Sequence, residues 1–365
     1  MSPVDLVIAA LREPARTADW RPAQWSALLQ QARSAGLLGR VLAVCSQAQG
    51  GDAHWPSAVR DHAIAAARLC RAQQDEVRRE SGHIRRALTP LGSPVVLLKG
   101  AAYVMAGLPA AQGRVFSDVD ILVPHATINE AESLLTLAGW LSTNADAYDQ
   151  RYYRTWMHEL PPMQHLHRQT TLDVHHNILP LTHRLRPSSE RLLAGATPLP
   201  EAPGLFVLQP VDMALHNMAH LFMNDEVGHA LRDLSDLDQL LRHFGQTPGF
   251  WTQLPQRAAE LNLDRVLFYG LQAAAATLGT PVPASTLAAA QTQGSPAWGT
   301  RALTSALWRC VLHSPHPTAR GPMYDLAAAA LYLRGHWLRM PPWLLARHLT
   351  VKALKRTQRT TAPTA

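Results

Sequence analysis

Cysteine is scarce in this sequence. The 365 residues include three cysteines, Cys45, Cys70 and Cys310, and no two of them form a Cys-x-x-Cys pair. Isolated thiols of this kind exclude a disulfide framework and a thiolate metal site, and they are typical of proteins in a reducing compartment. We therefore expect a cytoplasmic protein whose cysteines fill apolar positions.

Long apolar runs are also missing. Although 47% of the residues are hydrophobic, no stretch reaches the roughly 18 uninterrupted apolar residues that a membrane-spanning helix needs. The first residues show no basic segment followed by an apolar run, and no internal repeat is found. We expect no membrane span, and a chain of this length is expected to form two or three modules.

Acidic residues are outnumbered by basic ones. The sequence has 34 Lys and Arg against 27 Asp and Glu, a formal net charge of +7. This balance favours an anionic partner such as a nucleotide, a phosphorylated sugar or a nucleic acid. Residues 336–365 form a basic amphipathic tail that could contact RNA, a membrane surface or an acidic partner. A solvated terminus is the preferred interpretation, because no RNA-binding motif accompanies the tail.

Two aspartates lie on one side of an otherwise apolar strand over residues 117–123. Side chains of a strand alternate between its faces, so Asp118 and Asp120 point the same way and Val119 points the other way. Like charges held side by side repel, and oxygen ligands at this spacing suit Mg²⁺ or Mn²⁺. The alternative is that Asp118 caps a turn while Asp120 is solvated at a sheet edge.

A third carboxylate is a usual part of two-metal sites for phosphoryl transfer, where it holds the metal nearest the attacking group. Asp173 is the best candidate, because apolar and polar residues alternate over 170–175 as in a half-buried strand. A zinc site is the less favoured alternative, since the nearby histidines lack a pattern such as His-Glu-x-x-His. These histidines are His165, His167, His175 and His176.

Helical patterns flank these strands on both sides. Apolar spacing and start and stop signals predict helices over 22–36, 56–87, 127–139, 210–222 and 230–241, with a further helical pattern over 250–278. A short apolar run predicts a buried strand over 95–98, and a helix follows over 101–105. We expect an α+β fold with a small mixed β-sheet. Its expected parts are an N-terminal helical region (1–90), a catalytic core (91–205), a C-terminal helical domain (206–335) and the basic tail (336–365).

Together these elements resemble the uncharacterised nucleotidyltransferase family of the DNA polymerase beta-like nucleotidyltransferase superfamily. The resemblance is carried by Leu98-Lys99-Gly100, Arg114, Asp118-Val119-Asp120 and Asp173-Val174-His175. It extends to the helical flanks over 25–38 and 220–237. What it implies is a polymerase beta-like core that moves a nucleoside monophosphate from a nucleoside triphosphate to a hydroxyl or phosphate acceptor, with release of pyrophosphate.

The resemblance also implies roles for individual residues. Asp118, Asp120 and Asp173 would hold two divalent metals, Mg²⁺ or Mn²⁺, that bind the triphosphate. Lys99 would neutralise phosphate oxygens as a point charge, and Arg114 would do so as a bidentate fork. Gly100 and Ser117 are candidates for phosphate contacts, and His175 is a candidate for orienting Asp173 or touching the acceptor. The remaining candidates, which would contact the acceptor or support the site, are His220, Arg232 and Asp233.

Several alternatives stay open. The superfamily usually has Gly-Ser or Gly-Gly shortly before its carboxylate pair, whereas here a longer gap separates Gly100 from Asp118, which leaves the choice of nucleotide open. His216 and His220 share a helix face, either at a cleft or in the interior. A small acceptor such as a sugar phosphate is expected, and the alternatives are transfer to RNA or protein and a non-catalytic nucleotide-binding protein.

Overall fold

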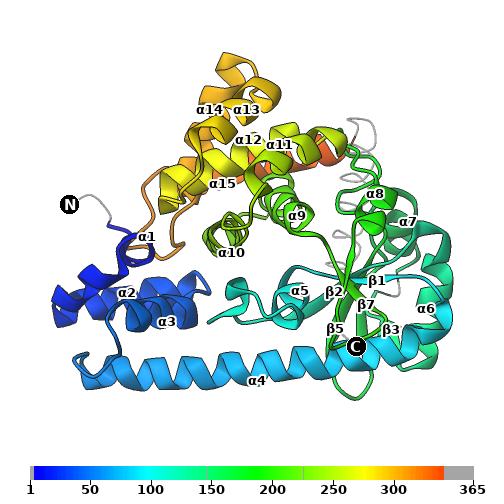
Figure 1. The fold of residues 1–365 in the computed structure, drawn as a ribbon, viewed down its shortest axis with the longest axis horizontal. Coiled ribbons are helices and arrows are strands. Elements are labelled where there is room, and N and C mark those ends of the chain that lie inside the picture. Colours follow the sequence, from blue (N-terminus) through cyan, green and yellow to red (C-terminus); the bar gives the residue numbers. More distant parts are fainter. Residues whose placement is uncertain (1–3, 145, 225, 341–365) are drawn as a thin grey trace, which may run out of the picture.

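The computed structural model describes residues 4–144, 146–224 and 226–340, which form helices around one mixed β-sheet. The part of the predicted basic tail over 341–365 lies outside the described residues. In Figure 1 the sheet lies at one side of the molecule, the N-terminal helices at the other, and the C-terminal helices above both. This arrangement agrees with the predicted α+β class.

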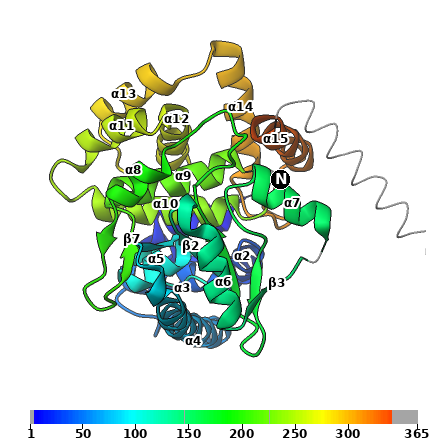
Figure 2. The ribbon, with the colours of Figure 1, turned by 90° about the vertical axis from the view of Figure 1, so that its right-hand side faces the viewer.

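The N-terminal helices lead to one long helix. They are α1 (Leu6–Arg12), a 3-10 helix (Pro14–Asp19), α2 (Pro22–Ser34), α3 (Leu38–Ala48) and α4 (Ser57–Leu88). The predicted helices over 22–36 and 56–87 are confirmed as α2 and α4. Pro22 begins α2 because its missing N–H needs no partner in the first turn. Figure 2 shows α4 beneath the rest of the core, and α4 contacts α3, α5 and α6.

Over the described ranges the sheet has seven strands, in the order β3-β4-β5-β2-β1-β7-β6. They are β1 (Val95–Leu98), β2 (Asp118–Leu122), β3 (Trp140–Ser142), β4 (Met163–His165), β5 (Thr171–His175), β6 (Thr197–Pro198) and β7 (Leu205–Val207). The central strand β2 pairs antiparallel with β1 and parallel with β5. The three predicted strands are therefore neighbours at the centre of the sheet.

Short helices connect these strands. They are α5 (Lys99–Met105), a 3-10 turn (Pro109–Ala111), α6 (Ile128–Leu137), α7 (Ala147–Trp156) and α8 (Ser189–Ala194). All four residues of β1 are buried, as the continuous apolar run predicts. The predicted helices over 101–105 and 127–139 are confirmed as α5 and α6.

The C-terminal region of the described chain is helical. Its helices are α9 (Pro210–Met223), α10 (Ala230–Phe244), α11 (Phe250–Glu260), α12 (Asp264–Ala273), a π-helical turn (Ala274–Leu278), α13 (Ala284–Gly294), α14 (Trp298–Val311) and α15 (Tyr324–Arg339). The structure places α9 against α5 of the core as well as α10, α11 and α12. None of the helices in the described ranges is long and apolar enough to cross a membrane.

Candidate active site

Three aspartates come together on one face of the central strands. The parallel register of β2 and β5 sets Asp120 beside Asp173, and Asp118 lies two residues earlier on the same face. Asp120 is 3% exposed. Because β1 and β5 flank it on both sides, Asp120 is not a solvated residue of a sheet edge.

Asp120 is held by two cationic or polar groups. Lys99 Nζ lies 2.7 Å from Asp120 Oδ1, and His175 Nε2 lies 3.0 Å from the same oxygen. Burial alone would raise the pKa of Asp120, but Lys99 and His175 hold it far below its ordinary value. Burial alone would lower the pKa of Lys99, and Asp120 raises it instead. Both groups of this pair are therefore charged at neutral pH.

Lys99 is the first residue of α5 and adopts a φ of +44°. Residues with a side chain rarely adopt this left-handed conformation, and such strain commonly persists where function requires it. The neighbouring Gly100 has a packing role, because a side chain there would collide with the ring of Phe116. The junction between β1 and α5 thus aims an ammonium group at the carboxylates.

One carboxylate oxygen of Asp173 has no partner among the described residues. Its Oδ1 is buried and accepts no hydrogen bond from any of them. Burial, followed by the charge of neighbouring Asp120, raises the pKa of Asp173 to about 7. A buried carboxylate oxygen without a partner, next to further carboxylates, fits a hard divalent cation. Asp118, Asp120 and Asp173 are therefore the residues that could hold Mg²⁺ or Mn²⁺.

His175 orients Asp120 and not Asp173. Its Nε2 faces Asp120, while its Nδ1 lies 3.3 Å from Glu159 Oε2. Glu159 was not predicted, and an isolated bridge between Glu159 and His175 brings it to the site. Burial alone would lower the pKa of His175, but the hydrogen bond with Asp120 and the charge of Glu159 raise it.

His158, Glu159 and His175 offer ligand atoms within 4.8 Å of one another and could hold a metal ion. Both nitrogens of His175 already face carboxylates, which favours its orienting role over direct metal binding. Of the four histidines considered for zinc, His165, His167 and His176 do not belong to this group.

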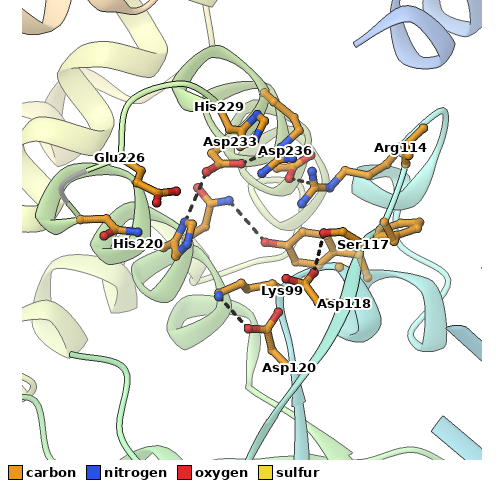
Figure 3. A pocket seen from close by; sticks show the side chains of 17 residues that line it. Lys99, Arg114, Ser117, Asp118, Asp120, His220, Glu226, His229, Asp233 and Asp236 are labelled. Carbon is orange, nitrogen blue, oxygen red and sulfur yellow. Dashed lines mark hydrogen bonds and ion pairs between the residues drawn. The ribbon is translucent and has the colours of Figure 1, made fainter. Parts of the chain in front are cut away.

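A cavity of about 290 Å³ opens beside Asp118 and Asp120, and Figure 3 shows its polar side chains. Residues of the core form one part of its lining: Lys99, Gly100, Tyr103, Arg114, Val115, Phe116, Ser117, Asp118 and Asp120. Residues of α9, α10 and their connection form the other: Asn217, His220, Asn224, Glu226, His229, Arg232, Asp233 and Asp236. Asp173 is not part of this lining.

Arg114 is fixed in the cavity wall by a carboxylate from α10. Its Nε lies 3.0 Å from Asp236 Oδ2, and its Nη1 is buried and has no hydrogen-bond partner in the part of the chain that the structure describes. The other Asp236 oxygen pairs with Arg40 of α3. Arg114 is therefore not a solvated loop arginine, and its unpartnered N–H group fits an anion such as a phosphate.

The long segment between Gly100 and Asp118 is explained by the position of Arg114 between α3 and α10. After α5 and a 3-10 turn, the chain docks on α3, where Arg40 donates hydrogen bonds to the carbonyl groups of Ala110 and Gln112. Gly113 has a φ of +65°, and a side chain there would collide with the backbone of Arg40. The extra residues thus place Arg114 between α3 and α10.

The remaining candidates divide between the two walls. Ser117 Oγ donates to Asp118 Oδ1 at 3.1 Å, so it holds the partly exposed aspartate. His220 Nδ1 lies 3.3 Å from Asp233 Oδ2, and Arg232 Nε lies 3.1 Å from Asp233 Oδ1. His216 is buried, whereas 31% of the His220 side chain is exposed. The two histidines on one helix face therefore have different surroundings.

Tyr103 and Asn217 are further cavity residues that the sequence analysis did not single out. The Asn217 amide donates to the Tyr103 hydroxyl at 3.3 Å, which links α9 to α5. The side-chain oxygen Oδ1 of Asn217 is buried and has no hydrogen-bond partner among the described residues. No motif surrounds either residue in the sequence, so their contribution follows from packing alone.

Comparison with known proteins agrees with the resemblance seen in the motifs. No curated protein matches the chain. A family model described as "Uncharacterised nucleotidyltransferase" matches residues 21–279, which is more than half of the chain and includes every residue of the cavity lining. The chain therefore belongs to this family of nucleotidyltransferases.

Proposed function

We propose that the protein transfers a nucleoside monophosphate from a nucleoside triphosphate to an acceptor, with release of pyrophosphate. One observation carries the proposal: Asp118, Asp120 and Asp173 share one face of adjacent strands beside a cavity lined by Lys99 and Arg114. Membership of a nucleotidyltransferase family supports this type of reaction. We further propose that the central strands form a polymerase beta-like core.

The three aspartates would hold Mg²⁺ or Mn²⁺, and the bound ions would neutralise the triphosphate and the departing pyrophosphate. Lys99 and Arg114 would bind phosphate oxygens, since both line the cavity and Arg114 has an unpartnered N–H group. Glu159 and Asp236 would fix the geometry through His175 and Arg114, which they contact. Positioning and charge neutralisation are what nucleotidyl transfer mainly requires of a protein.

A small acceptor is favoured by the size of the cavity. At about 290 Å³ it lies at the lower end of the range of small-molecule sites. The net charge of +7 favours a second candidate, transfer to RNA or protein. A protein that binds nucleotide without transferring it is the third candidate.

Label transfer tests the proposal and separates these candidates. The protein is incubated with Mg²⁺, each of the four α-labelled ribonucleoside triphosphates, and either glycerol, monosaccharides and sugar phosphates or total RNA. Label in a small product supports the leading candidate, and label in RNA or in the protein supports the second. The Asp118→Asn/Asp120→Asn double variant should lose transfer. Asp75→Asn is the matched control, because Asp75 pairs with Arg78 at an exposed position of α4.

We propose that residues 91–205 form the catalytic core between helical regions over 1–90 and 206–335. Asp236 pairs with both Arg40 and Arg114, which supports this division, because one residue from each helical region then holds an arginine of the core in place. The three cysteines are free, which supports a cytoplasmic location.

A further inference from the structure

A histidine and an aspartate form a pair on the wall of the cavity that α9 and α10 provide. His220 lies near the end of α9, and Asp233 lies in the first turn of α10. The ring nitrogen Nδ1 of His220 lies 3.3 Å from Asp233 Oδ2, and Figure 3 shows the pair beside the cavity. Arg232 holds the other oxygen of Asp233 at 3.1 Å.

This pair fixes where His220 carries its proton. Burial alone would raise the pKa of Asp233, but the hydrogen bond with His220 and the charges of Arg232 and Arg114 hold it well below its ordinary value. Asp233 is therefore ionised, and the proton of a neutral His220 lies on Nδ1, facing the carboxylate. The lone pair of Nε2 is then free to accept a proton, as in other histidine bases that a carboxylate orients.

Other groups at the site are less suited to accept a proton. Asp118 and Asp120 line the cavity, but they are proposed to hold the metal together with Asp173, which does not line it. Lys99 is charged in its pair with Asp120, as its raised pKa shows. His229 and Glu226 are exposed residues of the segment between α9 and α10, whereas His220 is held by a helix and a carboxylate. Preorganisation thus favours His220.

We propose that His220 is the base that deprotonates a hydroxyl group of the acceptor, and that Asp233 is its positioning residue. This inference rests on the proposed nucleotidyl transfer. The hydroxyl oxygen forms a bond to the α-phosphorus while the bond from that phosphorus to the bridging oxygen of pyrophosphate breaks. The hydroxyl proton moves to Nε2 of His220, pyrophosphate leaves with the electron pair, and the imidazolium returns its proton to water.

The proposal narrows the class of acceptor. A phosphate group carries about −1.5 to −2 charges at neutral pH and needs no base to become a nucleophile. An alcohol is protonated at neutral pH, and a positioned base then contributes directly to the rate. The histidine and aspartate pair therefore assigns the reacting group of the acceptor to a hydroxyl.

Transfer from α-labelled ATP, CTP, GTP and UTP to glycerol and D-glucose tests the proposal in wild type, His220→Ala, His220→Gln and Asp233→Asn. The His220 variants should lose turnover by roughly 10² to 10⁴-fold. Calorimetric affinity for each Mg²⁺–nucleotide should stay within about twofold, because His220 acts on the hydroxyl. Added imidazole should restore part of the turnover of His220→Ala, which a purely structural loss would not allow. Asp233→Asn should reduce turnover by a smaller factor.

His313→Ala is the matched control, since it removes another histidine–aspartate pair, His313 with Asp5 at 3.2 Å, outside the cavity. Its turnover should equal that of wild type. More than a tenth of wild-type turnover in a folded His220 variant, or a loss that imidazole does not restore, would overturn the role of His220. If His220→Ala fails to fold by circular dichroism, His220→Gln decides by its turnover. A wild type that transfers label neither to these acceptors nor to sugar phosphates, total RNA or protein would instead refute the proposed function, and this inference with it.

Discussion

Replacing Asp236 by alanine would remove a carboxylate that two buried guanidinium groups share. Asp236 pairs with Arg40 of α3 through Oδ1 at 2.5 Å and with Arg114 through Oδ2 at 3.0 Å. The side chains of Arg40 and Asp236 are each 2% exposed, and that of Arg114 is 10% exposed. The alanine variant would thus leave two buried cations without the carboxylate that pairs with both of them.

The expected cost follows from this burial. Removing one partner of a buried ion pair costs about 3–5 kcal/mol, because the other charge stays desolvated. Arg114 borders the cavity and can gain some hydration there, so Arg40 accounts for most of the loss. Asp236→Ala should therefore lower the free energy of unfolding by about 3–4 kcal/mol. Asp236→Asn should cost less, since the amide can still accept a hydrogen bond.

Urea denaturation followed by circular dichroism measures this change, provided the slope with denaturant is unchanged. Glu132→Ala is the matched control, because it breaks the Glu132–Arg154 pair, whose side chains are 20% and 39% exposed. The control should lose at most about 1 kcal/mol. A loss below about 1 kcal/mol for Asp236→Ala, or an equal loss for both variants, would refute the reasoning from burial.

Three further predictions concern other parts of the molecule. Lys99→Met removes the cation that pairs with Asp120. In calorimetry Mn²⁺ alone should then bind more tightly, while the Mn²⁺–nucleotide complex should bind at least about tenfold more weakly. Unchanged affinities would contradict the role of this ion pair. Burial lowers the pKa of His183 from 6.5 to about 4, so its stabilising contribution is present above pH 6.5 and is lost as the pH falls toward 4. Urea denaturation should show that the free energy of unfolding falls by up to about 3 kcal/mol over this pH window. His183→Gln should make the free energy of unfolding depend less on pH, and identical pH dependence in both proteins would contradict this role of His183. Gly113→Ala should lower the melting temperature, because Gly113 has a φ of +65° and contacts the Arg40 backbone. Gly50→Ala is the control and should lower the melting temperature less, because Gly50 has a φ of +70° but open space around it.

The carboxylates of the site could be predicted because strand alternation is a local property. Asp118, Asp120 and Asp173 lie on β2 and β5 as the alternating patterns predict, and the sheet pairs these strands. The strands β3, β4, β6 and β7 were not predicted. Each has two or three residues, which is too short for alternation to be recognised.

The supporting residues could not be predicted because they depend on contacts between distant segments. Arg40 and Asp236 are 196 residues apart in the sequence. Asp236 lies in a segment that resembles the family pattern, but nothing in that segment shows that Asp236 reaches Arg40. The helical spacing set His216 and His220 on one face, but it could not show which of them reaches the cavity. That outcome depends on the docking of α10, which brings Asp233 to His220.

Binding of Mn²⁺ measured by electron paramagnetic resonance, with and without a nucleoside triphosphate, tests the carboxylate site most directly. Wild type should bind Mn²⁺, and should bind it more tightly with the nucleotide, because Asp118, Asp120 and Asp173 share one face beside the cavity. Asp118→Asn/Asp120→Asn and Asp173→Asn should lose this binding, while Asp75→Asn should retain it. Absence of binding in wild type, or equal binding in all four proteins, would contradict a metal-dependent nucleotidyltransferase site at these aspartates.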